Sequence, residues 1–457
     1  MTKALGMKER FVLGQERRKQ VRRTVHAEWK ASERRESPLK LLAASMRGRV
    51  PALVTLKYER MATSPFGYFR GAVPVMAYDL SLVGNTGILS QLCGDAHVQN
   101  LGAYAGPDGR LLFDINDFDE TMVGPFEWDV KRMATSLVLA GRDAGVKNVH
   151  CREAAAAFLE RYRACIALFA RMPVLEMARY QVHRLKNISP VEGILRMAER
   201  ATPMHTLLAL TEPGKTAAPQ SDRVFKTVAP VLTRMRGKQA ERVVASLELY
   251  AASLLRERHH LFSQYKPVDV AFKVVGTGSV GLRDYCVYME GNGPKDPLFI
   301  QIKEEATSAY APYIGRVNGG NGLSNRRGTY HQGRRVVEGE RAMQMQSDPF
   351  LGWTTIDGRD YLVRQLNDHK ASIQMTDLKA AGLMEYASVC GELLARGHAR
   401  SGDCPMLAGY LGKSARFDDA VAKFAEAYAD QTERDWRELV RRMKKPEKEA
   451  AKPHRNP

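Results

Sequence analysis

The sequence contains no apolar run long enough to cross a membrane, which takes about 20 consecutive apolar residues. Residues 1–35 are rich in Lys, Arg and Glu, and they lack the apolar core that a secretory signal peptide requires. Both absences argue against a membrane protein or a secreted one. We therefore expect a cytoplasmic protein with no membrane partner.

The chain also lacks any pair of cysteines at CxxC spacing. Its six cysteines are scattered, at Cys93, Cys151, Cys165, Cys286, Cys390 and Cys404. This distribution argues against a zinc site or a disulfide framework, and it fits a reducing compartment.

No zinc finger or other nucleic-acid-binding motif accompanies the basic charge of the chain. The 69 Lys and Arg residues outnumber the 51 Asp and Glu residues, which gives a net charge of +18. Basic composition alone is weak evidence for nucleic-acid binding, and it also suits anionic substrates such as nucleotides. We do not expect nucleic acid to be the main partner.

The 457 residues are enough for two or three domains. Changes in composition and periodicity predict five ranges along the chain. They are a helical and aromatic/Arg-rich segment (1–87), a helical lobe that carries the acidic loops (88–265), a lobe of strands with a glycine loop (266–370), C-terminal helices that complete the helical lobe (371–445) and a disordered tail (446–457).

Within the first range, residues 57–71 are dense in aromatic side chains and arginine. Arg60 and Arg70 could face an anion, since guanidinium groups bind phosphate and carboxylate well. Structural pairing of both arginines with Asp or Glu is an equally good interpretation.

The strongest chemical signal is acidic. Asp95 and Asn100 follow a short apolar run, and residues 113–120 carry several further carboxylates. Ionised carboxylates at the ends of buried strands are costly unless a cation or hydrogen bonds compensate, and their oxygens suit Mg²⁺. A turn signal at 107–109 predicts a hairpin that brings Asp117 to the end where Asp95 lies.

Farther along, the pattern changes to strands around a glycine-rich loop. A strand predicted at 270–275 leads into the loop, and strands predicted at 285–289 and 298–303 follow, the last ending at Lys303. The loop residues singled out are Gly276, Gly278, Ser279 and Gly281.

A dinucleotide-binding loop requires a helix after the glycines, whereas here a strand follows. Strand, glycine loop and strand is the arrangement of the phosphate-covering loop of a protein kinase, whose lysine lies on the third strand. Lys303 occupies that place and Lys273 fits it less well. A glycine-rich hairpin with a solvent-facing lysine is the plain structural alternative.

The order of these parts is the reverse of that in an ordinary kinase, because Asp95, Asn100 and Asp117 precede the glycine loop. Residues 392–400 resemble the end of a helix that would lead into a catalytic loop, and they lead instead to 401–403 and another helix. The prediction is an α+β, protein-kinase-like fold of two lobes in a circularly permuted order. Permutation is tolerated where the chain ends lie close together at the surface.

Several segments together resemble a bacterial family known as domain of unknown function 2252. The segments are residues 60–66, 94–100, 114–120, 124–129 and 398–403. The resemblance covers most of the chain, and the family looks related to protein-kinase-like enzymes, particularly aminoglycoside phosphotransferases.

The resemblance implies a role for each matching residue of the acidic half. Asp95 resembles the catalytic base, Asn100 and Asp117 resemble the metal ligands, and Asp129 resembles the buried aspartate that braces the catalytic loop. Asp114 and Asp119 are also available as metal ligands. His97 lies within the loop, where we expect it to form structural hydrogen bonds.

The resemblance also implies that Lys303 contacts the α- and β-phosphates and that Glu338 holds Lys303 in place, with Glu340 as the alternative partner. The interval between Lys303 and Glu338 is long and requires an inserted loop.

The predicted function is an ATP- and Mg²⁺-dependent phosphotransferase whose hydroxyl acceptor, a small molecule or a protein, is unknown. Three alternatives remain open. The first is a nucleotide-binding protein that either transfers nothing or transfers the nucleotide itself. The second is that the acidic cluster is purely structural. The third is a two-metal phosphoesterase that uses Asp95, His97, Asp114, Asp117 and Asp119.

Overall fold

The computed structural model describes residues 5–181, 189–214, 223–274, 276–317, 330–366, 370–373 and 379–444. Helices and strands both contribute to the fold, so the predicted α+β class is confirmed. The tail predicted at 446–457 lies outside the described residues. Within the described ranges, no helix is long and apolar enough to span a bilayer.

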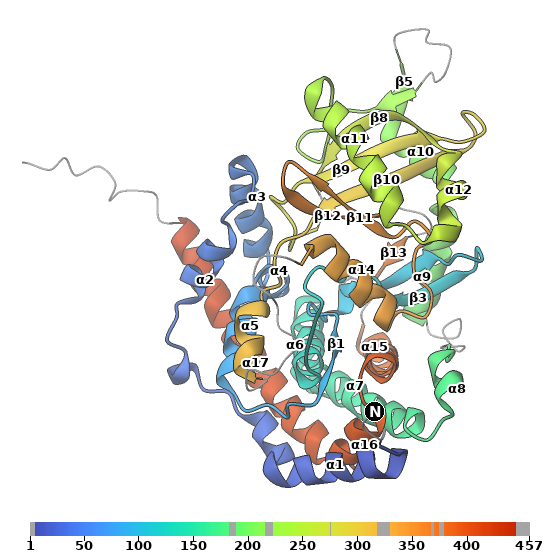
Figure 1. The fold of residues 1–457 in the computed structure, drawn as a ribbon. Helices are drawn as coiled ribbons and strands as arrows, with labels where there is room; N and C mark the ends of the chain where they lie inside the picture. The colour runs from blue at the N-terminus through green and yellow to red at the C-terminus, as the bar shows by residue number, and fades with distance from the viewer. Residues whose placement is uncertain are drawn as a thin grey trace, which may run out of the picture.

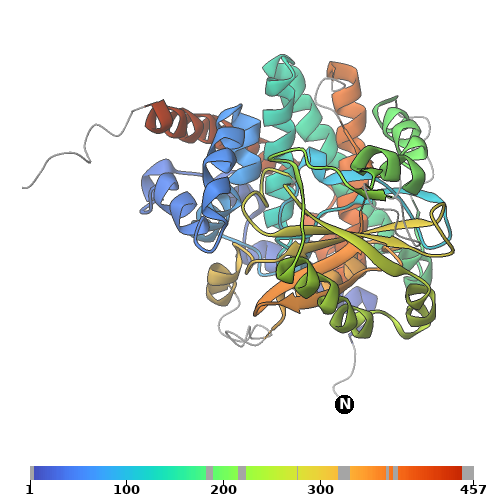
Figure 2. The same cartoon turned by 90° about the horizontal axis from the view of Figure 1, so that it is seen from above.

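The largest sheet has six antiparallel strands in the order β11-β12-β10-β9-β8-β7. Its strands are β7 (Leu232–Arg234), β8 (Lys266–Lys273), β9 (Asp284–Glu290), β10 (Pro297–Glu304), β11 (Gly352–Ile356) and β12 (Arg359–Gln365). Figures 1 and 2 show α11 (Lys238–Ser253) lying across this sheet. All residues of β9 and β10 are buried, because both faces of these central strands are covered.

Apolar packing joins α11 to the sheet. Val243 and Tyr250 of α11 belong to the same buried cluster as Val287, Ile300 and Ile302 of the central strands. The strands predicted at 285–289 and 298–303 are therefore confirmed as β9 and β10.

Helices form most of the rest of the molecule, below the sheet in Figure 1. The N-terminal helices are α1 (Met7–Gln20), α2 (Pro38–Ser45), α3 (Pro51–Ala62), α4 (Pro65–Gly71) and α5 (Val73–Leu82). The central and C-terminal helices are α6 (Glu127–Asp143), α7 (Asn148–Phe169), α15 (Ala380–Ser401), α16 (Cys404–Leu411) and α17 (Arg416–Lys444).

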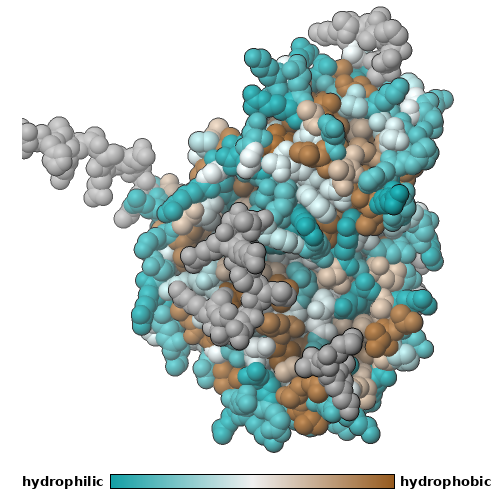
Figure 3. Space-filling view, in the orientation of Figure 1, coloured by the Kyte–Doolittle hydropathy of each residue, from teal (hydrophilic) through white to brown (hydrophobic). Residues whose placement is uncertain are grey.

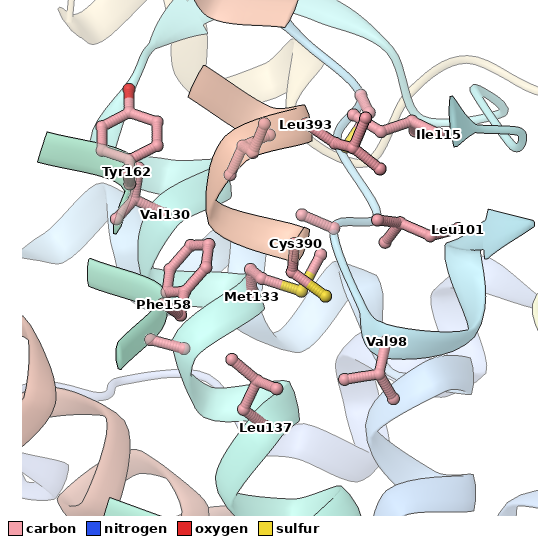
Figure 4. Packing of buried hydrophobic residues seen from close by; sticks show 14 of the residues in the cluster. Val98, Leu101, Ile115, Val130, Met133, Leu137, Phe158, Tyr162, Cys390 and Leu393 are labelled. Atoms are coloured by element: carbon pink, nitrogen blue, oxygen red, sulfur yellow. The ribbon is translucent and has the colours of Figure 1, made fainter. Parts of the chain in front are cut away.

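Helix α6 lies at the centre of this helical part. Its residues 127–141 are all buried, so it lacks the polar face of a surface helix. Figure 4 shows Met133 of α6 packed with Phe158 of α7 and Cys390 of α15. The surface is more polar than this interior. The face in Figure 3 is mostly hydrophilic, with scattered apolar side chains.

Short strands connect the helical part to the functional loops. They are β1 (Leu89–Leu92), β2 (Leu101–Ala105), β3 (Leu111–Ile115), β4 (Met122–Pro125) and β13 (Ala371–Ser372). The hairpin predicted around 107–109 is confirmed, since β2 and β3 pair from Leu101 and Ile115 onward. This register places the loops at 94–100 and 116–121 at the same end of the hairpin.

The remaining elements are shorter or lie at the edges. They are α8 (Val174–Ala178), α9 (Ser189–Arg200), α10 (Pro203–Leu210), β5 (Thr211–Pro213), β6 (Arg223–Phe225), α12 (His259–Ser263), α13 (Ala311–Val317) and α14 (Gln332–Met343). Of these, α14 carries the two glutamates that the sequence singled out.

Candidate functional site

A cavity of about 440 Å³ lies where the acidic loops meet the glycine loop. Most of the residues predicted for the site line it. They are Asp95, His97, Asp117, Asp119, Gly276, Gly278 and Ser279. The fold therefore brings together two groups of residues that are far apart in the sequence.

Asp95 is held by a buried arginine. Its Oδ1 accepts hydrogen bonds from Arg132 Nε at 2.8 Å and Arg132 Nη2 at 2.6 Å. The Arg132 guanidinium lies 4.2 Å from the ring centroid of Phe69 and also donates to the Phe69 carbonyl. Two nitrogens on one oxygen, with an aromatic face behind them, fix the direction of the Asp95 carboxylate.

Gly94 allows the loop to turn sharply just before Asp95. Its φ is +83°, and a Cβ built at this position would lie 2.1 Å from the Glu120 carbonyl oxygen. Only glycine fits a left-handed conformation with a neighbouring backbone this close.

Helix α6 braces the same loop from behind. The buried Asp129 carboxylate accepts from Cys93 N at 2.7 Å and Gly94 N at 3.0 Å. Farther along the loop, Val98 N donates to Ser136 Oγ at 2.9 Å. These contacts are the ones that a loop-bracing aspartate would make, as the family resemblance implied for Asp129.

Asn100 links the two acidic loops. Its Nδ2 donates to the Asp95 carbonyl at 2.8 Å and to the Asp117 carbonyl at 3.2 Å. Because Nδ2 is used by these carbonyls, Oδ1 is the atom of Asn100 that could contact a metal ion.

Lys303 crosses from the sheet to the acidic hairpin. Its side chain is 4% exposed, and its Nζ lies 2.5 Å from Asp119 Oδ2 and 3.6 Å from Asp117 Oδ1. Lysine is rarely buried without such partners. The predicted third-strand lysine and the predicted acidic residues therefore form one charged cluster.

The two carboxylates that contact Lys303 have pKa values shifted in opposite directions. Burial would raise the pKa of Asp117, but the charges of Lys303 and Arg364 together with a hydrogen bond from Asp119 outweigh it, and the pKa is lowered. Burial and the negative charge of Asp117 raise the pKa of Asp119, to about 7. Two close carboxylates cannot both be ionised cheaply unless a cation compensates. The pair is thus suited to take up a further cation.

Asp114 lies elsewhere, although its position in the sequence made it a third candidate ligand. Its buried carboxylate pairs with Arg396 of α15 and accepts from Ile115 N at 2.8 Å. Asp117 and Asp119 are the two carboxylates of this hairpin that face Lys303.

The donor set fits Mg²⁺ held jointly with phosphate oxygens. Across the part of the chain that the structure describes, no group of three or more His, Cys, Asp or Glu side chains is arranged as a complete metal site. Mg²⁺ usually takes one or two protein carboxylates and completes its shell with water and substrate phosphates. Asp117 and Asp119, with Asn100 Oδ1 nearby, match that incomplete set.

The predicted pairing of Lys303 with a glutamate of α14 is wrong. Glu338 is half-exposed and accepts from Arg334 Nε, one helical turn before it, at 2.7 Å, and from the Tyr330 hydroxyl. Glu340 lies two residues on, on the buried face, where burial raises its pKa to about 7 against the nearby charge of Arg364. Neither glutamate forms an ion pair with Lys303 among the described residues, because Asp119 and Asp117 occupy that lysine.

The glycine loop is fixed to the N-terminal helices through its carbonyls. Lys57 Nζ donates to Thr277 O at 3.1 Å and Gly278 O at 2.5 Å, and Arg60 donates to Gly276 O. Arg49 donates to Val280 O at 2.5 Å, and Val50 N donates to Gly281 O at 2.7 Å. We call Arg49, Lys57 and Arg60 the basic clamp.

A family model supports the same grouping of segments. It is described as an uncharacterized protein conserved in bacteria (DUF2252), and it matches residues 49–442. The chain belongs to this family. The matched range of the DUF2252 protein includes the basic clamp, both acidic loops, the glycine loop and Lys303. No curated protein and no solved structure matches the chain.

Sequence reasoning assigned no role to three residues that hold the loops of this DUF2252 protein in place. They are Arg49 and Lys57 of the clamp, and Arg132, which orients Asp95. The dense arginine and aromatic content of 57–71 was the available signal for the clamp. Arg132 had a weaker one, since it lies three residues after Asp129 and so shares a face of the same helix.

Proposed function

We propose that this DUF2252 protein is an ATP- and Mg²⁺-dependent phosphotransferase with a circularly permuted, protein-kinase-like arrangement of two lobes. The single observation that carries the proposal is the contact of Lys303 with Asp117 and Asp119 beside the Asp95 loop. A lysine on the third strand of a series in which the glycine loop follows the first strand, facing carboxylates that could hold a metal ion, is the arrangement of the phosphate site in protein kinases.

The chain ends support the permuted order. The N-terminal segment packs on the C-terminal helices, with His26 Nε2 2.7 Å from the Tyr410 hydroxyl and Trp436 Nε1 donating to Ala62 O at 3.0 Å. A permutation needs the two ends of the chain in the same region. Figure 1 shows α1 and α16 side by side, in agreement with their packing contacts.

Each residue then has a defined chemical role. Asp95, oriented by Arg132, would accept the proton of the acceptor hydroxyl as its oxygen attacks the γ-phosphorus and the bond to ADP breaks. Asp117 and Asp119 would hold Mg²⁺, which neutralises phosphate charge when bound. Lys303 would contact the α- and β-phosphates. Positioning and charge stabilisation of this kind supply most of the rate enhancement in phosphoryl transfer.

The reaction products show whether a phosphoryl group or a whole nucleotide is transferred, and to which acceptor. Mass spectrometry separates a phosphorylated product from a nucleotidylated one, because the added masses differ greatly. The phosphoesterase alternative has less support, since Asp114 pairs with Arg396 and does not reach the cavity.

Calorimetry with ATP and Mg²⁺ tests the proposal. The intact protein should bind the nucleotide in a Mg²⁺-dependent manner, and Asp117→Ala should lose the Mg²⁺ dependence. Asp108→Ala is a matched control, because Asp108 lies in the turn of the same hairpin and, among the described residues, its side chain pairs with nearby Arg110 and Gln346 alone. Absence of nucleotide binding to the intact protein would contradict the proposal.

A further inference from the structure

The cavity extends from Asp95 along a wall formed by the N-terminal helices. Leu41 and Ala44 of α2 and Pro74 of α5 line this part, together with Tyr313 of α13. Lys303 does not line the cavity, although its carboxylate partners do. Asp95 itself lines the cavity, so this wall borders the space where an acceptor hydroxyl would have to approach its base.

Two arginines of this wall are available to a ligand. The other cations around it are committed, with Arg49 and Lys57 bonded to loop carbonyls and Arg132 bonded to Asp95. Arg47 is exposed at the cavity edge. Arg70 lines the cavity and is partly buried, and its fully buried Nε has no hydrogen-bond partner among the described residues. A buried guanidinium is costly without a counter-charge, and an anion in the cavity would supply one.

Arg70 is placed between the two functional loops. The carbonyl of its neighbour Phe69 accepts from Arg132 Nη2 at 3.1 Å. Its own carbonyl oxygen lies 3.6 Å from a Cβ built on Gly278. Asp95 and Asp117 are near enough to oppose the lowering of the Arg70 pKa by burial, yet they pair with Arg132 and Lys303 instead.

The glutamates of the cavity do not satisfy these arginines. Glu120 Oε2 accepts from Ala309 N at 2.6 Å. Burial raises the pKa of Glu305 well above its usual range, which favours the neutral acid. The positive charges of Arg47 and Arg70 are thus not paired with these glutamates, and they can attract an anion that enters the cavity.

We infer that the acceptor is a small organic anion with a hydroxyl group, bound through its phosphate or carboxylate by Arg70 and Arg47. The apolar part of such a molecule would lie against Leu41, Ala44 and Pro74. A cavity of about 440 Å³ is within the usual range for small-molecule sites. The identification of this ligand as the acceptor rests on the proposed phosphotransferase function.

Binding of four small probes to the full chain, without nucleotide or Mg²⁺, tests the inference. The probes are glycerol 3-phosphate, glycerate, neutral glycerol and cationic ethanolamine, compared by calorimetry at one ionic strength. The two anions should bind, and the tighter of them shows whether phosphate or carboxylate is preferred. Arg70→Gln and Arg47→Gln should each weaken anion binding by about tenfold or more, the usual effect of losing a charge-assisted hydrogen bond.

Arg256→Gln is the matched control, because Arg256 is exposed and does not line the cavity. Arg70→Gln should keep the thermal unfolding temperature, since this side chain has no hydrogen bond to lose at Nε. Equal binding of glycerol or ethanolamine, or unchanged anion binding in both variants, would overturn the inference.

The test of the anion site can fail or succeed independently of the test of the phosphotransferase function. Anion binding without any binding of ATP and Mg²⁺ would retain the anion site and refute the phosphotransferase. ATP binding with no anion binding would refute only the acceptor class. An equal loss of ATP and anion affinity in Arg70→Gln would assign the arginine to the nucleotide phosphates and overturn its role toward the acceptor.

Discussion

At the scale of single residues, His97 is the group whose protonation is most closely tied to the Asp95 loop. Its Nδ1 accepts from Gln99 N at 3.2 Å, and its Nε2 lies 3.6 Å from Asp95 Oδ2. A second proton would have to displace the Nδ1 hydrogen bond inside a buried site. Burial accordingly lowers the pKa of His97 from 6.5 to about 4. The imidazole is neutral at pH 7 and serves the structural role that the sequence predicted.

The low pKa of His97 predicts a loss of stability in mild acid. Between pH 6.5 and about 4 the unfolded chain takes up a proton at this site and the folded chain does not. The free energy of unfolding should therefore fall as the pH drops through that window, by up to about 3 kcal/mol, and the contribution should level off below it. Urea unfolding across this pH range measures the effect.

The variant His97→Asn isolates this contribution from those of other titrating groups. Asparagine can still accept from Gln99 N and does not titrate. The difference in unfolding free energy between the two proteins should shrink as the pH falls. A parallel pH dependence of both proteins would refute the assignment to His97.

At the scale of elements, the glycine loop is anchored to the N-terminal segment through its carbonyls. Its carbonyls are bound by the basic clamp from α3 and the segment before it. A loop anchored in this way through its carbonyls would keep its shape if phosphate oxygens contacted its backbone N–H groups.

Removal of the central clamp residue should loosen the loop selectively. Lys57→Met deletes both hydrogen bonds to Thr277 and Gly278 while keeping a side chain of similar length. Amide hydrogen exchange at 276–281 should accelerate by about tenfold, with little change in β9 and β10. Lys423→Met, at an exposed position of α17, is the matched control. Equal acceleration across the whole sheet would indicate global destabilisation instead.

At the scale of the whole molecule, one buried arginine joins the two ends of the chain. Arg34 Nη1 lies 2.8 Å from Asp435 Oδ2 of α17, and Arg34 also pairs with Asp79 of α5. Tyr428 donates to Asp79 at 2.6 Å. This network connects the range 1–87, which carries the basic clamp, to the C-terminal helices.

Loss of Arg34 should therefore destabilise the whole protein. Arg34→Met leaves two buried carboxylates without their cation, which typically costs about 3 kcal/mol or more. Urea unfolding of this variant measures the cost. Arg35→Met is the matched control, since Arg35 is exposed and should change the unfolding free energy by less than about 0.5 kcal/mol. Similar stabilities of the two variants would contradict this role.

The sequence by itself determined the local parts of the site. Short apolar runs flanking turn signals identified the hairpin that carries Asp117 and the strand that ends at Lys303, because strand pairing across a short turn depends on neighbouring residues. Motif spacing, together with the family resemblance, also placed Asp95 and Asn100 on one loop and Asp129 on the next helix.

Only the tertiary structure decided which distant side chains meet. Lys303 pairs with Asp119 and Asp117 rather than Glu338, Asp114 pairs with Arg396, and Lys57 bonds to a loop 220 residues away. Charged side chains have many possible partners in a chain with 69 basic and 51 acidic residues. Their choice depends on burial and on the packing of remote elements, and neither is expressed in the local sequence pattern.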